Sequence, residues 1–250
     1  MIRASGFLLS SPDFRDSLNI VYRRDFHYGR FLMTDSHSIK AVVFDMDGVL
    51  FDSERITRIM WKKAADEWGL SDIETAVRDC TGSSRPDQWV YLKKKYGGDF
   101  KAKEFREYCS ALFHSYVDEN GLPLMPHAKE ILSYLKEKKY PLALASSTRR
   151  IAVEKELKDA GLWSYFNATI CGDEVEHSKP APEIYLRACS LLGLDPELCC
   201  AVEDSPNGIR SAHSAGMKCV MVPDQIQPDG EIKEMLYRLC TSLEDLRTFL

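Results

Sequence analysis

The sequence has no long hydrophobic run, no excess of basic residues and no cysteine spacing typical of a metal or disulfide site. No apolar run reaches the roughly eighteen residues that a membrane-spanning helix needs. A formal net charge of −5 leaves no broad basic surface for nucleic acid. We therefore expect neither a membrane nor a nucleic acid as the main partner.

The eight cysteines form no CxxC pair and have no metal-ligand spacing with the six histidines. Most of them lie within apolar runs, where a reduced cysteine behaves as a small core residue. This usage favours a reducing compartment, so we expect a cytoplasmic protein.

The length and composition allow one large domain or a domain with an inserted subdomain, since the chain has 250 residues and is 44% hydrophobic. Residues 1–32 lack the continuous apolar segment and the cleavage site of a signal peptide. A mitochondrial-type targeting segment is a weaker interpretation, because Asp13, Asp16 and Asp25 interrupt its positive charge. We expect residues 1–38 to be an N-terminal extension that is disordered or not native.

The segment from residue 54 to 123 has helical periodicity and few strand-like runs. Apolar residues recur at three- and four-residue steps after Ile56 and again after Phe105, and glycines punctuate the segment. Its position predicts a helical cap domain inserted into a core domain made of residues 39–53 and 124–250.

Outside this segment, short apolar runs alternate with helical patterns. Such alternation predicts βαβ units and a parallel sheet covered by helices on both faces. The predicted fold class is α/β, with a Rossmann-like parallel sheet and an inserted α-helical cap. The expected strands are 39–44, 140–145, 168–171, 199–202 and 218–222, and the expected helices between them are 127–139, 149–160, 182–192 and 206–215.

The motif FDMDGVLFDSE, residues 44–54, is the most informative stretch of the chain. Asp45 and Asp47 directly follow the first expected strand, at the sheet edge where open α/β folds bind ligands. Two carboxylates separated by one residue can have different roles: Asp45 can act as a nucleophile toward phosphorus, and Asp47 as a proton donor and acceptor. A turn that only binds a cation is the alternative for this motif alone.

Three later segments end at the same sheet edge. Ser146 and Ser147 open a helix, where hydroxyl and backbone N–H groups suit a phosphate oxygen; such serines taken alone are more often an N-cap, and both roles can hold together. Lys179 precedes Pro180 and Pro182 in SKPAPEIY, which make the entry to the next helix rigid, and it can neutralise a carboxylate and a phosphoryl group. Glu203 and Asp204 can bind Mg²⁺ through oxygen atoms or simply complement a helix dipole.

These four segments, in this order, resemble the motifs of the haloacid dehalogenase-like (HAD) superfamily over residues 39–250, and Met33 would be an ordinary start for that family. The resemblance implies the HAD fold and catalysis with Mg²⁺. It implies Asp45 as nucleophile, Asp47 as acid and base, Ser146 and Lys179 as phosphoryl-binding groups, and a metal site made by Asp45, the Asp47 carbonyl, Asp204 and Glu203.

The position of the cap resembles the subgroup that contains β-phosphoglucomutase and sugar-phosphate phosphatases. In TGSSRPDQW, residues 81–89, Arg85 matches the mutase arginine that binds a distal phosphate, although an exposed arginine before a helix is an equal alternative. Ser147 and Asn207 are further candidates for substrate binding. Thr57 lies where the mutase has a histidine that links cap closure to its acid–base aspartate, which favours hydrolysis.

We therefore expect a Mg²⁺-dependent phosphatase that hydrolyses a small phosphomonoester, such as a sugar phosphate, through an aspartyl-phosphate. A phosphomutase of the β-phosphoglucomutase type is the second hypothesis, and a non-catalytic regulatory protein is a remote third. The expected partner is a small phosphorylated metabolite and the expected state is a monomer, because a cap can close the site without a second subunit.

Overall fold

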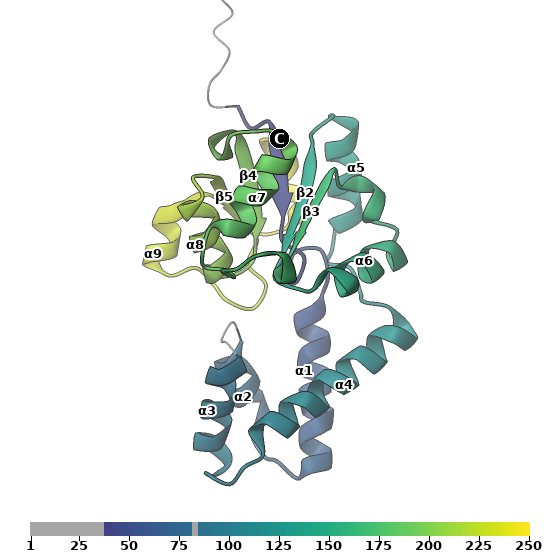
Figure 1. Ribbon diagram of the computed structural model, residues 1–250, viewed down its shortest axis with the longest axis vertical. Coiled ribbons are helices and arrows are strands. Elements are labelled where there is room, and N and C mark those ends of the chain that lie inside the picture. The colour runs from purple at the N-terminus through teal and green to yellow at the C-terminus, as the bar shows by residue number, and fades with distance from the viewer. Residues whose placement is uncertain (1–37, 82–84) are drawn as a thin grey trace, which may run out of the picture. The chain divides into compact units, whose positions relative to one another are not determined.

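A parallel β-sheet lies at the centre of the part of the chain that the structure, a computed structural model, describes: residues 38–81 and 85–250 (Figure 1). The prediction of an N-terminal extension falls on residues outside this part, except for Ser38. Six strands pair in the order β3-β2-β1-β4-β5-β6, every pair parallel. The strands are β1 (Ala41–Phe44), β2 (Leu142–Ser146), β3 (Ala168–Cys171), β4 (Cys199–Glu203), β5 (Lys218–Met221) and β6 (Leu236–Leu239).

The central strands β1, β2 and β4 are buried at every position because both faces of the sheet are covered, and they are apolar except at their last residues Ser146 and Glu203. Along β1, Val42 and Phe44 belong to one hydrophobic cluster, whereas Ala41 and Val43 belong to the cluster on the other face. Helices α5 (Ala128–Glu137) and α6 (Arg150–Asp159) pack on the first face. Helices α7 (Glu183–Leu192), α8 (Pro206–Ser214) and α9 (Gly230–Met235) pack on the second (Figure 1). The predicted α/β class with a Rossmann-like parallel sheet is confirmed.

The last strand and helix have no counterpart in the sequence-based expectation. In β6 the first residue is partly buried and the next three are exposed, so this edge strand carries no apolar run. Helix α9 has only six residues, too few for a clear helical period. Short 3₁₀ turns complete the structure: η1 (Trp163–Tyr165), η2 (Gly172–Glu174), η3 (Pro196–Leu198) and η4 (Leu243–Thr248).

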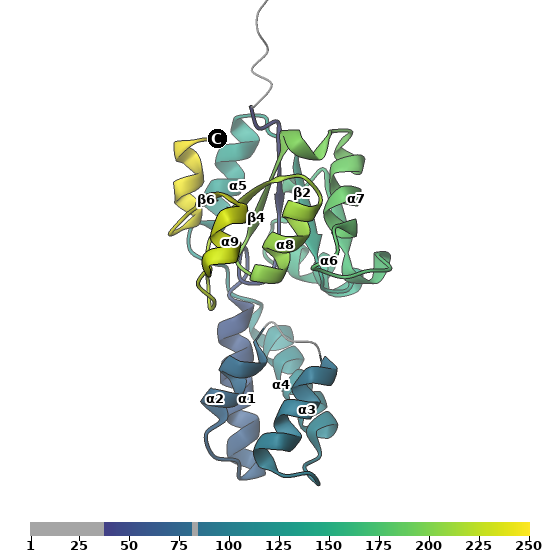
Figure 2. The ribbon, with the colours of Figure 1, turned by 90° about the vertical axis from the view of Figure 1, so that its left-hand side faces the viewer.

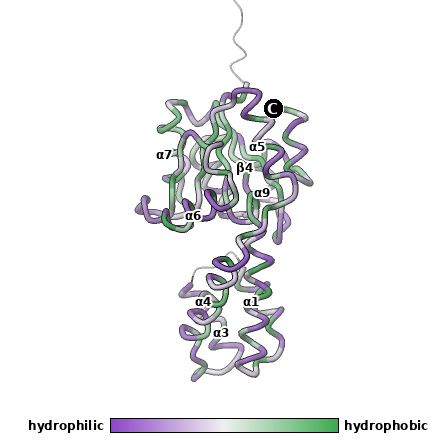
Figure 3. Tube along the Cα trace, turned by 90° about the vertical axis from the view of Figure 1, so that its right-hand side faces the viewer, coloured by the Kyte–Doolittle hydropathy of each residue, from purple (hydrophilic) through white to green (hydrophobic). Residues whose placement is uncertain are grey.

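The segment between β1 and α5 consists of helices that have their own hydrophobic cluster. They are α1 (Ser53–Trp68), α2 (Ile73–Cys80), α3 (Arg85–Tyr96) and α4 (Ala102–Asn120), seen together in Figure 2. Trp61, Leu92 and Phe105 are nearly or fully buried in this cluster. Figure 3 shows hydrophilic and hydrophobic residues alternating along α1 and α4, as expected for helices with one buried face.

Two chain segments join these helices to the sheet and lie side by side. Phe51 and Leu124 form an antiparallel bridge. The Asp52 N–H donates to the Pro123 carbonyl at 2.9 Å, and the Met125 N–H donates to the Leu50 carbonyl at 2.9 Å. The insertion therefore begins and ends at one paired connection. None of the helices in residues 38–81 and 85–250 combines the length and hydrophobicity needed to cross a membrane.

Candidate active site

The ends of neighbouring strands bring three charged side chains together. The Lys179 ammonium donates to Asp45 Oδ1 at 2.6 Å, to Glu203 Oε1 at 2.6 Å and to the Ala145 carbonyl at 2.9 Å. The Lys179 side chain is only 8% exposed, and Glu203 is fully buried. Burial alone would lower the pKa of Lys179, but the charges of Asp45 and Glu203 raise it, so this lysine stays protonated.

Glu203 uses both of its carboxylate oxygens within the protein. Besides Lys179, Oε1 accepts a hydrogen bond from the Tyr185 hydroxyl at 2.8 Å. Oε2 accepts from the backbone N–H of Asp204 at 3.2 Å, and from the N–H and hydroxyl of Ser205 at 3.3 and 3.1 Å. A Cβ on Gly208 would lie 1.9 Å from this carboxylate, so only glycine leaves room for it. Glu203 is thus held in place as the buried counter-charge of Lys179.

Asp204, in contrast, approaches the first motif with its carboxylate. A Cβ added to Gly48 would lie 2.4 Å from Asp204 Oδ2, and Gly48 has a φ of +76°. Glycine is required here both for the left-handed backbone and for the close approach. Gly48 therefore lets Asp204 approach the loop that follows β1.

The carboxylates at this point suit a hard divalent cation. Asp45, Glu203 and Asp204 each offer an oxygen atom, and these oxygens lie within 4.8 Å of one another. Burial raises the pKa of Asp45 to about 7; Lys179 opposes the rise, and Glu203 and Asp47 add to it. Burial and the charges of Glu203 and Asp45 raise the pKa of Asp204 well above its usual range. A bound cation would relieve this repulsion, and carboxylate oxygens are ligands that such a cation prefers.

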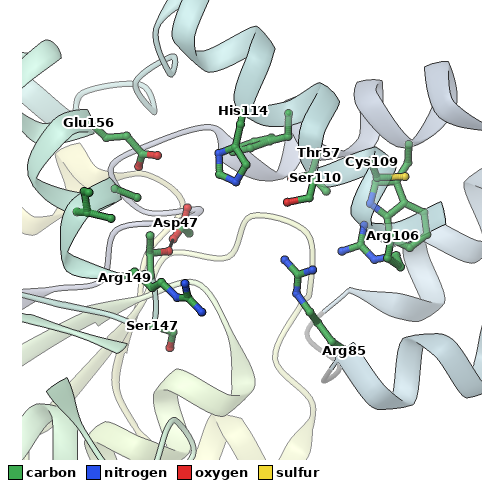
Figure 4. Close-up of a pocket in the computed structure, with 15 residues that line it drawn as sticks. Asp47, Thr57, Arg85, Arg106, Cys109, Ser110, His114, Ser147, Arg149 and Glu156 are labelled. Carbon is green, nitrogen blue, oxygen red and sulfur yellow. Dashed lines mark hydrogen bonds between the residues drawn. The ribbon is translucent and has the colours of Figure 1, made fainter. Parts of the chain in front are cut away.

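Asp47 lies where two cavities meet. The smaller, of about 190 Å³, is lined by Asp45, Lys179 and Asp204, and the larger, of about 860 Å³, lies between the sheet edge and the helical insertion. Asp47 and Ser147 line both cavities, and Figure 4 shows them in the larger one. The Thr148 hydroxyl donates to Asp47 Oδ2 at 2.9 Å and so orients this carboxylate.

The other predicted site residues occupy different positions. Ser146 is fully buried, and its hydroxyl accepts a hydrogen bond from the Thr148 N–H at 3.1 Å, as in a serine turn; the N-cap of α6 is Arg149, so the N-cap interpretation of Ser146 is wrong. Arg85, at the start of α3, lines the larger cavity, as does Thr57. Asn207 lies in the first turn of α8 and is absent from the described residues that line either cavity.

Comparison with known proteins gives the family. A family model described as haloacid dehalogenase-like hydrolase matches residues 39–216, more than half of the chain. The chain belongs to the haloacid dehalogenase-like hydrolase family. The resemblance that the four motifs indicated is confirmed, and so is the prediction that the chain is an enzyme.

Several HAD-family relatives are similar along most of their length. The phosphorylated carbohydrates phosphatase of Thermotoga maritima is 33% identical over 184 residues, which cover 72% of this chain and 83% of that protein. Hexitol phosphatase B of Escherichia coli (strain K12) is 32% identical over 198 residues, which cover 76% of this chain and 86% of that protein. The crystal structure of β-phosphoglucomutase from Clostridium difficile has the same fold, with a TM-score of 0.64 at 24% identity over 83% of this chain and 93% of that one.

Three charged residues that line the larger cavity were not expected from the HAD motifs. Arg106 lies on α4 and stacks over the Trp61 ring at 4.2 Å. Arg149 follows the second motif directly, which was the one available signal for it. Glu156 lies within α6, seven residues further on, where the sequence shows only a helical pattern.

Proposed function

We propose that this HAD-family enzyme is a Mg²⁺-dependent phosphatase that hydrolyses a small sugar or polyol phosphate through an aspartyl-phosphate. One observation carries the proposal: Asp47 lies at the junction of a small polar cavity, which contains Asp45, and a larger cavity. A phosphoryl group fits the first cavity and its leaving alcohol the second. The scissile bond would then lie beside Asp47.

In the first half of the reaction, Asp45 is the nucleophile. A carboxylate oxygen of Asp45 attacks phosphorus, and the bond between phosphorus and the leaving oxygen breaks. Asp47 gives its proton to that oxygen, so the product leaves as a neutral alcohol. Lys179 remains protonated and offsets the negative charge that the phosphoryl group brings to Asp45.

In the second half, water replaces the alcohol. Asp47, now ionised, accepts a proton from the water, whose oxygen attacks phosphorus while the bond to Asp45 breaks. The products are inorganic phosphate and free Asp45, with Asp47 again protonated. The Thr148 hydroxyl holds Asp47 through Oδ2 in both halves.

The metal site that we propose consists of Asp45, Asp204 and the backbone carbonyl of Asp47. When bound there, Mg²⁺ would neutralise negative charge on the phosphoryl oxygens and on Asp45. Glu203 is a weaker candidate ligand than the sequence indicated, because both of its oxygens already accept hydrogen bonds from neighbouring groups.

The lining of the larger cavity supports a polar substrate. Arg85, Arg106 and Arg149 reach it from α3, α4 and the loop before α6 (Figure 4). Burial lowers the pKa of Arg106, and the positive charge of Arg85 lowers it further, so an anionic or hydroxylated group between them would be favourable. The two relatives named as phosphatases of phosphorylated carbohydrates and hexitols fit this chemistry.

Hydrolysis is favoured over phosphoryl transfer to a second sugar. Thr57 lines the larger cavity where a mutase-type histidine would lie by resemblance, and a threonine cannot exchange a proton with Asp47 near neutral pH. The paired connection at Phe51 and Leu124 gives the helical insertion, which we propose is a cap, a hinge for opening and closing. We further infer a cytoplasmic monomer, since one chain supplies the whole site and the eight cysteines are buried and form no disulfide.

The test is phosphate release from a panel of hexose, pentose and hexitol phosphates, with Mg²⁺ or with EDTA. Asp45→Asn serves as the inactive control, and isomerisation of β-glucose 1-phosphate with its bisphosphate activator is measured in parallel. We expect metal-dependent release by the wild type and a loss of about a thousandfold or more in Asp45→Asn. Isomerisation that outpaces release would show a mutase instead.

A further inference from the structure

Glu156 occupies a position in α6 where the helix faces the protein interior. The buried residues of this helix are Val153, Glu156 and Leu157, and the two apolar ones belong to the hydrophobic cluster on that face of the sheet. Glu156 is only 9% exposed. A carboxylate at such a position loses much of its hydration, which destabilises the folded chain unless another group compensates.

No hydrogen bond or ion pair to the Glu156 carboxylate compensates within the part of the chain that the structure describes. The other buried acids there, Asp45 and Glu203, both accept a hydrogen bond from Lys179. The carboxylate of Glu156 has neither a hydrogen bond nor a salt bridge within residues 38–81 and 85–250, although its backbone carbonyl accepts the helical hydrogen bond from the Ala160 N–H at 3.0 Å. Burial raises the pKa of Glu156 to about 7; the charge of Asp47 adds to the rise, and the charge of Lys155 opposes it without forming an ion pair with Glu156. A buried acid without a partner calls for an explanation.

The carboxylate faces the larger cavity. In Figure 4 it points into the space bounded by Asp47 and His114, and all three residues line this cavity. Across the cavity, Arg85 and Arg106 approach from the helical insertion. The cavity therefore has a cationic end at the helical insertion, which suits an anionic group, and an end at the sheet edge where the acids Asp47 and Glu156 lie on the same side as Arg149.

We propose that Glu156 is a specificity-determining residue that accepts a hydrogen bond from a hydroxyl group of the leaving alcohol, close to the oxygen that Asp47 protonates. This inference rests on the proposed phosphatase function. It explains why a buried acid is retained where an apolar residue would pack, because the substrate supplies the missing partner. It also orients the substrate, with hydroxyl-bearing carbons at Glu156 and any second anionic group at the arginines.

The test combines changes in the substrate with substitutions at Glu156, using the full chain with Mg²⁺. kcat/KM is measured for a hexitol phosphate and its series of monodeoxy analogues, with the wild type, Glu156→Leu and Glu156→Gln. Leucine matches the apolar face of α6, and glutamine keeps an acceptor without the charge. Asp159→Asn is the control: it removes one acid from the same helix, at a side chain that is 56% exposed and paired with Lys155.

One analogue lacks the hydroxyl group that contacts Glu156. For that analogue we expect the kcat/KM of the wild type and of Asp159→Asn to be about tenfold to a hundredfold lower than for the parent hexitol phosphate. The decrease should be smaller for Glu156→Gln and less than about threefold for Glu156→Leu. Equal discrimination by the wild type and Glu156→Leu over the whole series, in variants with unchanged circular dichroism, would overturn the inference alone. If the wild type releases no phosphate from any sugar or polyol ester, the proposed function fails and this inference fails with it.

Discussion

The acids around Lys179 differ in how many of their oxygens the protein already uses. Glu203 is fully buried, and its two oxygens accept hydrogen bonds from Lys179, Tyr185 and the backbone and side chain of Ser205. Asp204 is partly exposed and its carboxylate lines the smaller cavity. We infer that Glu203 positions Lys179, whereas Asp204 binds the cation.

This difference predicts separate effects of two conservative substitutions. Glu203→Gln weakens the pairing with Lys179 and turns an amide NH₂ toward other N–H donors, so kcat falls by about tenfold to a hundredfold. The Mg²⁺ concentration for half-maximal activity stays within about threefold of the wild type, since no ligand is lost. Asp204→Asn removes a ligand charge and raises that concentration by about tenfold or more.

Metal titrations of phosphate release, with circular dichroism to confirm folding, check this prediction. A Glu203→Gln enzyme whose activity recovers at high Mg²⁺ would show that Glu203 is a metal ligand after all. An Asp204→Asn enzyme with an unchanged titration would exclude Asp204 from the metal site.

At the scale of elements, the loop between β1 and α1 depends on Gly48. Its φ of +76° and the approach of Asp204 both exclude a side chain. Gly69 at the end of α1 has a φ of +66°, but nothing lies within 4 Å of where its Cβ would be. Substitutions of these two glycines by alanine therefore distinguish the effect of backbone strain, which both share, from the effect of crowding Asp204, which only Gly48 shows.

We expect Gly48→Ala to lower metal-dependent phosphate release by about a hundredfold, because the methyl group displaces Asp204. Gly69→Ala should lose about 1 kcal/mol of stability from the left-handed backbone and keep its activity within about twofold. Activity assays and denaturant unfolding of both variants provide the comparison. Equal activity losses would indicate that strain, and not displacement of Asp204, causes the effect.

The sequence predicted best the strands that are buried on both faces, because such strands must be apolar along most of their length. Residues 41–44 and 199–202 are buried on both faces and form continuous apolar runs, and the acids that follow them mark one sheet edge. Strand β6 is exposed on most of its length and carries no such run. Ser146 shows a further limit: one motif contains two adjacent serines, and only backbone direction decides that Ser147 faces the cavities.

At the scale of the whole molecule, the larger cavity exists only because separate parts of the chain converge. Arg85 and Arg106 lie on helices of the insertion, whereas Arg149 and Glu156 belong to the sheet domain. Their spacing in the sequence follows no rule, since it depends on how the insertion packs above the sheet edge. The family was therefore predictable from local motifs, and Arg85 from the resemblance of its loop, whereas the positions of Arg106, Arg149 and Glu156 in the larger cavity were not.

The burial of acidic groups makes the stability of the folded chain depend on pH when no metal is bound. Folding raises the pKa of Asp45 from 3.8 and that of Glu156 from 4.5, both to about 7. Each group binds its proton more tightly in the folded state, so its contribution is fully present below a pH of about 4 and is lost as the pH rises through about 7. Divalent cations bind the ionised folded site and oppose this loss.

We therefore expect the melting temperature in EDTA to fall by about 5 °C or more between pH 5 and pH 8, with a smaller fall in excess Mg²⁺. Glu156→Gln, which removes one of these titrating groups, should flatten the profile in EDTA. Thermal melts at matched ionic strength provide the measurement. A melting temperature that rises over this range in EDTA would contradict the account.

The central claim, covalent transfer to Asp45 with Asp47 as acid and base, is tested most directly with Asp47→Asn and p-nitrophenyl phosphate. Nitrophenolate leaves without a proton donor, but hydrolysis of the aspartyl-phosphate needs the base. The account predicts a burst of about one nitrophenolate per enzyme molecule, followed by slow turnover, and one phosphoryl group on the peptide that contains Asp45 by mass spectrometry after an acid quench. Steady release without a burst, with Asp45 unmodified, would contradict it.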